Sequence, residues 1–389
     1  MPPVTNNSLQ TAAPTISVFY NGTDTLKKGQ LVCYQRNYSG SGVTATDVER
    51  RNYYVQKPGY TNRGWAAGWV NKLPRETGVA GEIEIIPVGG EATHEIEVWT
   101  DENITYGDIL GVCPGDYATG RWTCGQPLAM AIESQDRSTT SGTVKCVVGR
   151  FAIPDAATLS AKRIQWFDDF TGRFTAGATT ALGVNDVTSY VTEGTTVTSV
   201  FADSLGPDQA TAGKQAAGAL RVTSTTTSTG QLRQNGEPYR IDVNKSVFFR
   251  CRFATEEVAN NLALIGLSIT DTDAQSTLPT DYIAFKVAEA DLIFAYVKDG
   301  TTGLVSNTGM ATLTADVFVD AAFIVRNRGT GGMTIRCWVD GTEKTITSTT
   351  TEIPDDEALT FLGSVIGSDN NKSIILDTLE IDNYVGLTA

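Results

Sequence analysis

The chain has 389 residues, 41% of them hydrophobic, and a formal net charge of −14. This length suggests two or three domains of about 150 residues each. The acidity argues against a nucleic-acid-binding surface, which needs a basic stripe. No apolar run approaches the ~18 residues that span a bilayer, and the N-terminus lacks the basic and apolar regions of a signal peptide. We therefore expect a soluble protein without a membrane partner, made in a cytoplasm.

The first 15 residues are polar and contain Pro2, Pro3 and Pro14. They show no periodicity, so alone they should be extended or disordered. Because they lead into the strand-like run Ile16-Ser-Val-Phe-Tyr20, two interpretations stay open. The segment is either a frayed tail or an N-terminal arm that pairs with a neighbouring subunit.

From residue 16 to about 152, short alternating runs separated by Gly, Pro and Asn turns predict one compact β-domain. Trp65 and Trp69 are four apart and should share a face of one strand, which favours core or interface packing over sugar stacking. The expected strands lie at 16–20, 30–34, 53–55, 65–70, 79–88, 95–99, 104–112, 122–124, 127–133 and 143–151.

Five short motifs follow one another in this domain. They are Lys28-Gly-Gln-Leu-Val, Gly81-Glu-Ile-Glu-Ile, Ile104-Thr-Tyr-Gly-Asp-Ile-Leu, Leu128-Ala-Met-Ala-Ile-Glu and Val144-Lys-Cys-Val-Val. Their order resembles the small β-tulip domain of tailed-phage capsid decoration proteins. The resemblance implies a β-barrel-like fold, binding to the major capsid protein, a homotrimer, and a place on the outer surface of the virion. Candidate capsid or trimer contacts are Ile16, Val18, Tyr20, Trp65 and Trp69.

Residues 153–165 are expected to be a linker, because Pro154 breaks the last strand. From 166 to 389, longer alternating strands are separated by Thr-, Ser- and Gly-rich stretches, which predicts a two-sheet jelly-roll sandwich. The Asp340-Gly341 pair signals a tight hairpin. The order of these strands resembles the concanavalin A-like lectins and glucanases. The expected fold class is thus all-β, a small N-terminal β-tulip or β-barrel-like domain followed by this sandwich.

Catalytic and metal sites are poorly supported. The only histidine, His94, is flanked by Glu91 and Glu95 on an expected strand edge, so we interpret it as a lone surface histidine rather than as the base of a catalytic triad. No second histidine exists to build a metal or Cys–His site. Glu380 and Asp382 share a strand face, as a pair of glycosidase acids would, but position 385 is Val where laminarinase-like relatives carry a third acid. We interpret them as a solvent-facing strand edge. Asp271 with Asp273, and Asp355 to Glu357, are weak calcium candidates.

The six cysteines form no C-x-x-C pair and are expected to be free, half-buried thiols. The sequence therefore predicts a capsid decoration protein that bridges capsid subunits, with no catalytic residue, cofactor or metal, and no enzymatic activity. A carbohydrate-binding adhesin or fibre module, with a host glycan as its partner, is the first alternative. A glycoside hydrolase is the second.

Overall fold

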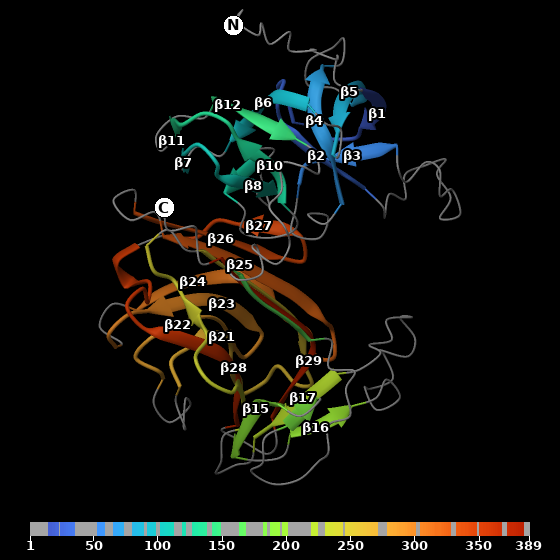
Figure 1. Ribbon diagram of the computed structural model, residues 1–389. Helices are drawn as coiled ribbons and strands as arrows, with labels where there is room; N and C mark the ends of the chain where they lie inside the picture. Colours follow the sequence, from blue (N-terminus) through green and yellow to red (C-terminus); the bar gives the residue numbers. More distant parts are fainter. Residues whose placement is uncertain are drawn as a thin grey trace, which may run out of the picture. The chain divides into compact units, whose positions relative to one another are not determined.

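In the computed structural model the chain forms two compact units, residues 1–159 and 160–389 (Figure 1). The structure describes residues 15–22, 24–35, 53–58, 65–73, 80–88, 92–98, 102–112, 119–121, 127–137, 142–148, 163–168, 182–184, 187–194, 197–200, 219–224, 230–243, 246–270, 278–300, 304–327, 332–347, 350–367 and 372–384. Among these residues the regular elements are β-strands, apart from the short 3₁₀ helix η6 (Thr350–Glu352). The predicted all-β fold class is confirmed. The arm at 1–14 and most of the linker at 153–165 lie outside the described residues.

The N-terminal unit contains two closed five-stranded barrels, where the sequence predicted one barrel-like fold over residues 16–152. The blue strands in Figure 1 form the first barrel and the cyan-to-green strands form the second. The first barrel consists of β1 (Ile16–Tyr20), β2 (Leu31–Tyr34), β3 (Tyr54–Gln56), β4 (Ala66–Lys72) and β5 (Gly81–Pro87). The second consists of β6 (Ala92–Val98), β8 (Ile109–Val112), β9 (Thr119–Arg121), β10 (Pro127–Ala131) and β12 (Gly142–Val148). β7 (Glu102–Ile104) and β11 (Gln135–Arg137) pair beside it.

Strand alternation places the barrel cores. Along β5, Ile83 and Ile85 are buried, whereas Glu82 is exposed and Glu84 is partly exposed, as the period of two predicts. The predicted pairing of Trp65 and Trp69 on one face is wrong. Trp65 is 42% exposed and Trp69 is fully buried. A bulge in the pairing of β4 with β2, opposite Val32 and Cys33, inserts an extra residue and breaks the alternation between them.

The C-terminal unit is a sandwich of two sheets. The sheet that we name after its strand β29 contains β13 (Arg163–Asp168), β16 (Val197–Val200), β17 (Ala219–Thr223), β20 (Ser246–Thr255), β25 (Val319–Asn327), β26 (Met333–Val339), β27 (Thr342–Lys344) and β29 (Ser373–Tyr384). The β28 sheet contains β14 (Leu182–Val184), β15 (Val187–Gly194), β18 (Gly230–Gln234), β19 (Tyr239–Arg240), β21 (Asn261–Ser268), β22 (Tyr282–Ala288), β23 (Asp291–Val297), β24 (Val305–Thr312) and β28 (Ala358–Gly367).

Aromatic side chains from both sheets fill the space between them. Phe249 of β20 stacks on Phe323 of β25 with ring centroids 5.0 Å apart, and Phe323 also contacts Phe294 of β23. Burying rings of this size contributes to the hydrophobic driving force for the sandwich, together with the aliphatic residues of the same cluster. The predicted Asp-Gly hairpin is confirmed, since Asp340 and Gly341 have φ of 48° and 82° and connect β26 to β27 in two residues.

Candidate functional site

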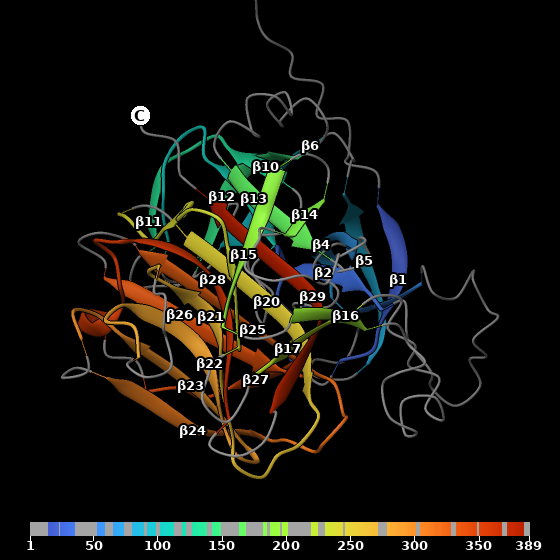
Figure 2. The same ribbon diagram turned by 90° about the horizontal axis from the view of Figure 1, so that it is seen from below.

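The outer face of the β29 sheet carries a group of charged side chains at its centre. In β20, Phe249, Cys251 and Phe253 point into the core, so Arg250 and Arg252, which alternate with them, point outward. β29 and β25 are the two neighbours of β20, and in Figure 2 the red β29 lies beside the yellow β20. Carboxylates on these two strands therefore lie next to the two arginines.

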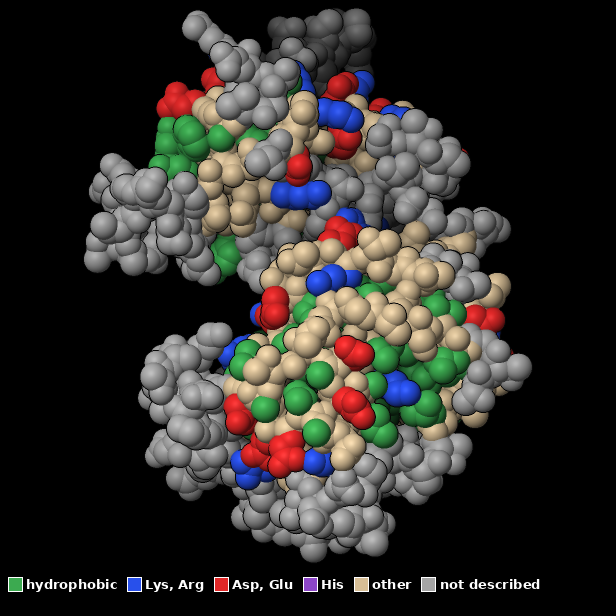
Figure 3. All heavy atoms as spheres, turned by 180° about the vertical axis from the view of Figure 1, so that it is seen from behind, with side chains coloured by type: hydrophobic (Ala, Val, Ile, Leu, Met, Phe, Trp, Pro, Cys, Tyr) green, Lys and Arg blue, Asp and Glu red, His purple; other side chains and the backbone are tan. Residues whose placement is uncertain are grey.

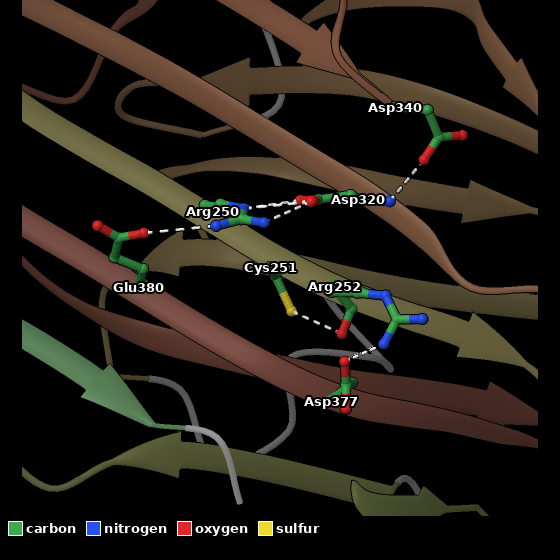
Figure 4. A network of polar contacts seen from close by, with 7 residues as sticks. All are labelled: Arg250, Cys251, Arg252, Asp320, Asp340, Asp377 and Glu380. Carbon is green, nitrogen blue, oxygen red and sulfur yellow. Dashed lines mark hydrogen bonds and ion pairs between the residues drawn. The ribbon is translucent and has the colours of Figure 1, made fainter. Parts of the chain in front are cut away.

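Arg250 is held between two acids, as Figure 4 shows. Its Nε donates to Asp320 Oδ1 at 2.9 Å, and its Nη2 donates to Asp320 Oδ2 at 2.6 Å. On the other side, its Nη1 lies 3.8 Å from Glu380 Oε2. The guanidinium plane thus has a fixed orientation, because a bidentate pair constrains both direction and rotation.

Arg252 forms a second ion pair, with Asp377 of β29. A bulge in the pairing of β20 with β29 gives β29 an extra residue at this point, and Asp377 is that residue. The guanidinium carbon also lies 4.2 Å from the centre of the Phe318 ring, within reach of a cation–π contact. The backbone nitrogen of Asp320 donates to Asp340 Oδ1 at 2.9 Å, which ties the hairpin to the network.

An exposed aromatic ring lies beside this network. Phe167 of β13 stands directly opposite Glu380 in the strand register, and Glu380 in turn stands opposite Arg250. The three side chains therefore form one row across three strands on the same face. Phe167 is 61% exposed, whereas the Arg250 and Glu380 side chains are 26% and 17% exposed. We call Phe167, Arg250, Arg252, Asp320, Asp377 and Glu380 the charged face.

The charged face can offer two kinds of contact at once. Phe167 supplies an apolar ring surface, and the ion-paired groups supply planar donors and acceptors in fixed positions. Of these residues, only Glu380 is a candidate from the sequence. The available signal was the run Phe248-Phe-Arg-Cys-Arg-Phe253, in which two charges alternate with buried residues.

The interpretation of Glu380 and Asp382 as an exposed strand edge is wrong. β29 is an inner strand, paired with β20 on one side and with β13 and β17 on the other. Asp382 is 1% exposed, and Glu380 belongs to the charged face. Of the two acids, only Glu380 therefore belongs to the candidate site.

The outer face of the β28 sheet has a different character. Its described side chains include a buried apolar cluster of Leu264, Tyr282, Ala284, Ala295, Val297 and Leu362. Figure 3 shows one face of the molecule, on which hydrophobic and charged side chains are interspersed over the C-terminal unit and several acidic ones lie together at its lower edge. Because polar ligands need fixed donors and acceptors, the charged face is the better candidate.

Metal binding finds no support in the described part of the chain, where no group of three or more His, Cys, Asp or Glu side chains could hold an ion. Asp355 and Asp356 instead bind Lys298, with Nζ–O distances of 2.6 and 3.2 Å. Asp271 and Asp273 lie outside the described residues. The described cysteines Cys33, Cys146, Cys251 and Cys337 are free and buried. No described helix is long and apolar enough to cross a membrane.

The five candidate contacts in the N-terminal unit differ in exposure. Val18, Tyr20 and Trp69 are at most 1% exposed. Val18 and Tyr20 belong to the core of the first barrel, and Trp69 is buried in the apolar cluster of the second barrel. Ile16 and Trp65 are 38% and 42% exposed. Contact of any of them with a capsid or a trimer partner stays a prediction.

No protein-family model matches this chain, and no curated protein matches its sequence. Several solved structures share its β architecture at low identity. A protein of unknown function from Shewanella oneidensis is 13% identical to this chain, with a TM-score of 0.40. The match covers 58% of this chain and 89% of the Shewanella chain. An endo-1,3-β-glucanase from Streptomyces sioyaensis is 11% identical over 60% and 99% of the two chains, with a TM-score of 0.36. A carbohydrate esterase from bacteriophage phi24B is 15% identical over 50% and 90%, with a TM-score of 0.35.

The C-terminal unit has a jelly-roll fold. At these identities and scores the likeness concerns the fold alone, which lectins and glycan-active enzymes share, peanut lectin among them. The prediction that the chain is not an enzyme is contradicted. A glucanase, a glucuronan lyase and an alginate lyase are among the solved structures that match this chain.

Proposed function

We propose that the C-terminal unit binds carbohydrate, with the charged face as its binding surface. One observation supports this proposal most directly. The exposed ring of Phe167 lies in register with Glu380 and Arg250, so an apolar plane and a set of fixed polar groups share one row.

A sugar ring needs both of these features. Its C–H face packs on an aromatic ring, and its hydroxyls need planar donors and acceptors placed at the rim. Ion pairs across three strands hold Arg250, Arg252 and their carboxylates in place before a ligand arrives. Side chains that are already ordered lose little conformational entropy on binding, which favours affinity.

The test is binding of the full-length protein to a glycan array, followed by titration of any hit. We expect Phe167→Ala and Arg250→Gln to weaken binding about tenfold or more. Trp65→Ala is the matched control, because Trp65 is also an exposed aromatic residue but lies in the N-terminal unit. Absence of any hit, or equal affinity of all variants, would overturn the proposal.

Turnover of a bound glycan is a separate outcome of the same experiment. Hits are incubated with the protein, and new reducing ends or unsaturated products are measured. If product forms, Glu380→Gln separates the two roles of this acid, because loss of turnover with retained binding would assign it to the reaction. No product from any hit leaves glycan binding as the function.

Capsid decoration is a second candidate for the chain as a whole, with the N-terminal unit on the major capsid protein and the jelly roll projecting outward. The observation that favours it is the pair of closed barrels, a rigid platform with exposed Ile16 and Trp65. Its test is co-sedimentation with procapsids and with expanded heads of the phage that encodes the chain. Co-sedimentation with neither would remove this candidate and leave glycan binding unaffected.

A further inference from the structure

The two barrels of the N-terminal unit are copies of one fold. The closed ring runs β1-β3-β2-β4-β5 in the first barrel and β6-β9-β8-β10-β12 in the second. Each ring has one parallel pair, β1 with β3 and β6 with β9, at the same place. All the other pairs in both rings are antiparallel. The second ring therefore repeats the first strand for strand.

The same turn precedes the second strand of each barrel. Gly29 and Gly107 have φ of 86° and 89°. Each turn is closed by a side chain that accepts from a backbone nitrogen at 2.7 Å, Gln30 from Lys27 and Asp108 from Thr105.

The backbone contacts of the two turns also match. Gly29 N donates to Val70 O at 2.8 Å, as Gly107 N donates to Ala131 O at 2.8 Å. Equal numbers of residues separate Tyr20 from Gly29 and Val98 from Gly107. The correspondence thus holds residue by residue.

The first barrel uses an outer row of three apolar residues to dock on the second. Leu31, Trp69 and Ile86 stand opposite one another on β2, β4 and β5. All three are buried in the hydrophobic cluster of the second barrel. At the edge of this joint Gly29 O accepts from Glu97 N of β6 at 2.9 Å.

The second barrel carries the same row, and the described residues form no third barrel that receives it. Ile109, Met130 and Val147 stand opposite one another on β8, β10 and β12. Ile109 is 2% exposed, whereas Met130 and Val147 are partly exposed and Tyr106 beside the turn is 71% exposed, so the accessible part of the surface is formed by the last three. A Cβ added to Gly107 would meet no described atom within 4 Å, whereas one on Gly29 would lie 2.8 Å from Glu95 O.

We infer that the row Ile109–Met130–Val147, with Tyr106, docks on the first barrel of a second copy of this chain. The internal joint shows that a barrel of this fold fits such a row, and the first barrel has the same fold. In the first barrel, the strand equivalent to β6 is β1, and Ile16 of β1 is 38% exposed. The contact is head-to-tail, because different surfaces of the two copies meet.

The contact between copies differs from the internal joint in one respect. The donor equivalent to Glu97 N is Phe19 N, which donates to Tyr53 O of its own barrel at 2.8 Å. The contact therefore relies on apolar side chains without this backbone hydrogen bond. We expect it to dissociate on dilution, while the internal joint persists. This inference depends neither on glycan binding nor on a capsid.

The first test is the mass of the full-length protein by light scattering over a range of concentrations. We expect an oligomer that dissociates on dilution, and a monomer for the double variant Tyr106→Ser, Met130→Gln at every concentration. Phe167→Ser removes an exposed aromatic residue elsewhere and should leave the mass unchanged. A wild-type monomer up to about 100 μM would overturn the inference, as would a double variant that assembles like the wild type.

A second test does not depend on a destabilising change. The exposed Tyr106 is replaced by the photoreactive p-benzoylphenylalanine, and the irradiated protein is analysed by gel and peptide mapping. Cross-linked dimers joined to residues of the first barrel around Ile16 support the inference. Cross-links confined to one chain, or cross-links to the C-terminal unit of another copy, would refute it.

Discussion

The carbonyl oxygen of Gly29 accepts a hydrogen bond from the backbone nitrogen of Glu97, and this contact joins two barrels of the same fold. The left-handed φ of Gly29 and the backbone of Glu95, which lies 2.8 Å from the position of a Cβ, both require glycine. Gly107 has the same φ but open space around it. Substitution of each glycine in turn therefore separates the free-energy cost of the backbone conformation from the cost of steric crowding.

We predict that Gly107→Ala lowers the free energy of unfolding by about 1–2 kcal/mol, from the conformational cost alone. Gly29→Ala should cost about 1–3 kcal/mol more, because the barrels must also move apart. The measurement is denaturant unfolding of the full-length protein, followed by a signal from the N-terminal unit. Equal losses for the two variants would show that the joint does not constrain Gly29.

The ion pair between Arg250 and Asp320 should contribute measurably to stability. Its side chains are 26% and 17% exposed, and its geometry is bidentate. A double-mutant cycle with Arg250→Met and Asp320→Asn should give a coupling energy of about 1–2 kcal/mol. The control cycle uses Lys57 and Asp24, which lie 3.9 Å apart with side chains 43% and 54% exposed. There we expect less than about 0.5 kcal/mol.

His94 should make the N-terminal unit less stable in mild acid. Burial lowers the pKa of His94, and the nearby Lys28 charge lowers it further, against a smaller opposite effect of Glu95. Between the ordinary pKa of about 6.5 and the lowered one, the unfolded chain binds more protons than the folded chain. Stability is therefore full above the ordinary pKa and falls as the pH drops through this window.

The measurement is the difference in melting temperature between pH 7.5 and pH 5. His94→Gln should show a smaller loss than the wild type, and the carboxylates that titrate in both proteins cancel in the comparison. Lys28→Ala should also reduce the loss, because it removes a charge that repels the imidazolium. An equal loss in all three proteins would mean that His94 does not set this dependence.

The sequence predicted the class of fold well, because alternation of apolar and polar residues reports directly on strands with one buried face. It missed the duplication. Gly29-Gln-Leu and Gly107-Asp-Ile were interpreted as successive motifs of one domain, although they are equivalent turns. The loop that follows β2 in the first barrel is much longer than the loop that follows β8 in the second. The residues that flank the two turns also differ, Lys28 against Tyr106. Spacing alone therefore does not reveal the repeat.

The charged face was hidden for another reason. Arg250, Asp320 and Glu380 are far apart in the sequence and meet only through the order of strands in the sheet. Alternation places each of them on an outer face but does not say which strands are neighbours. A bulge shifts Asp377 onto Arg252, and bulges leave no reliable sequence signal. Neither the network nor its partner Phe167 could therefore be assembled from the sequence.

The four described cysteines should resist alkylation in the folded protein. Burial raises the pKa of each of the thiols of Cys33, Cys146, Cys251 and Cys337, so almost no reactive thiolate is present at neutral pH. We predict that iodoacetamide leaves all four unmodified at pH 8 and modifies them fully in 6 M guanidinium chloride. Peptide mass spectrometry resolves each site. Rapid labelling of Cys33 or Cys146 alone would reveal opening of the barrels, and labelling of Cys251 or Cys337 would mean that the sandwich core is accessible.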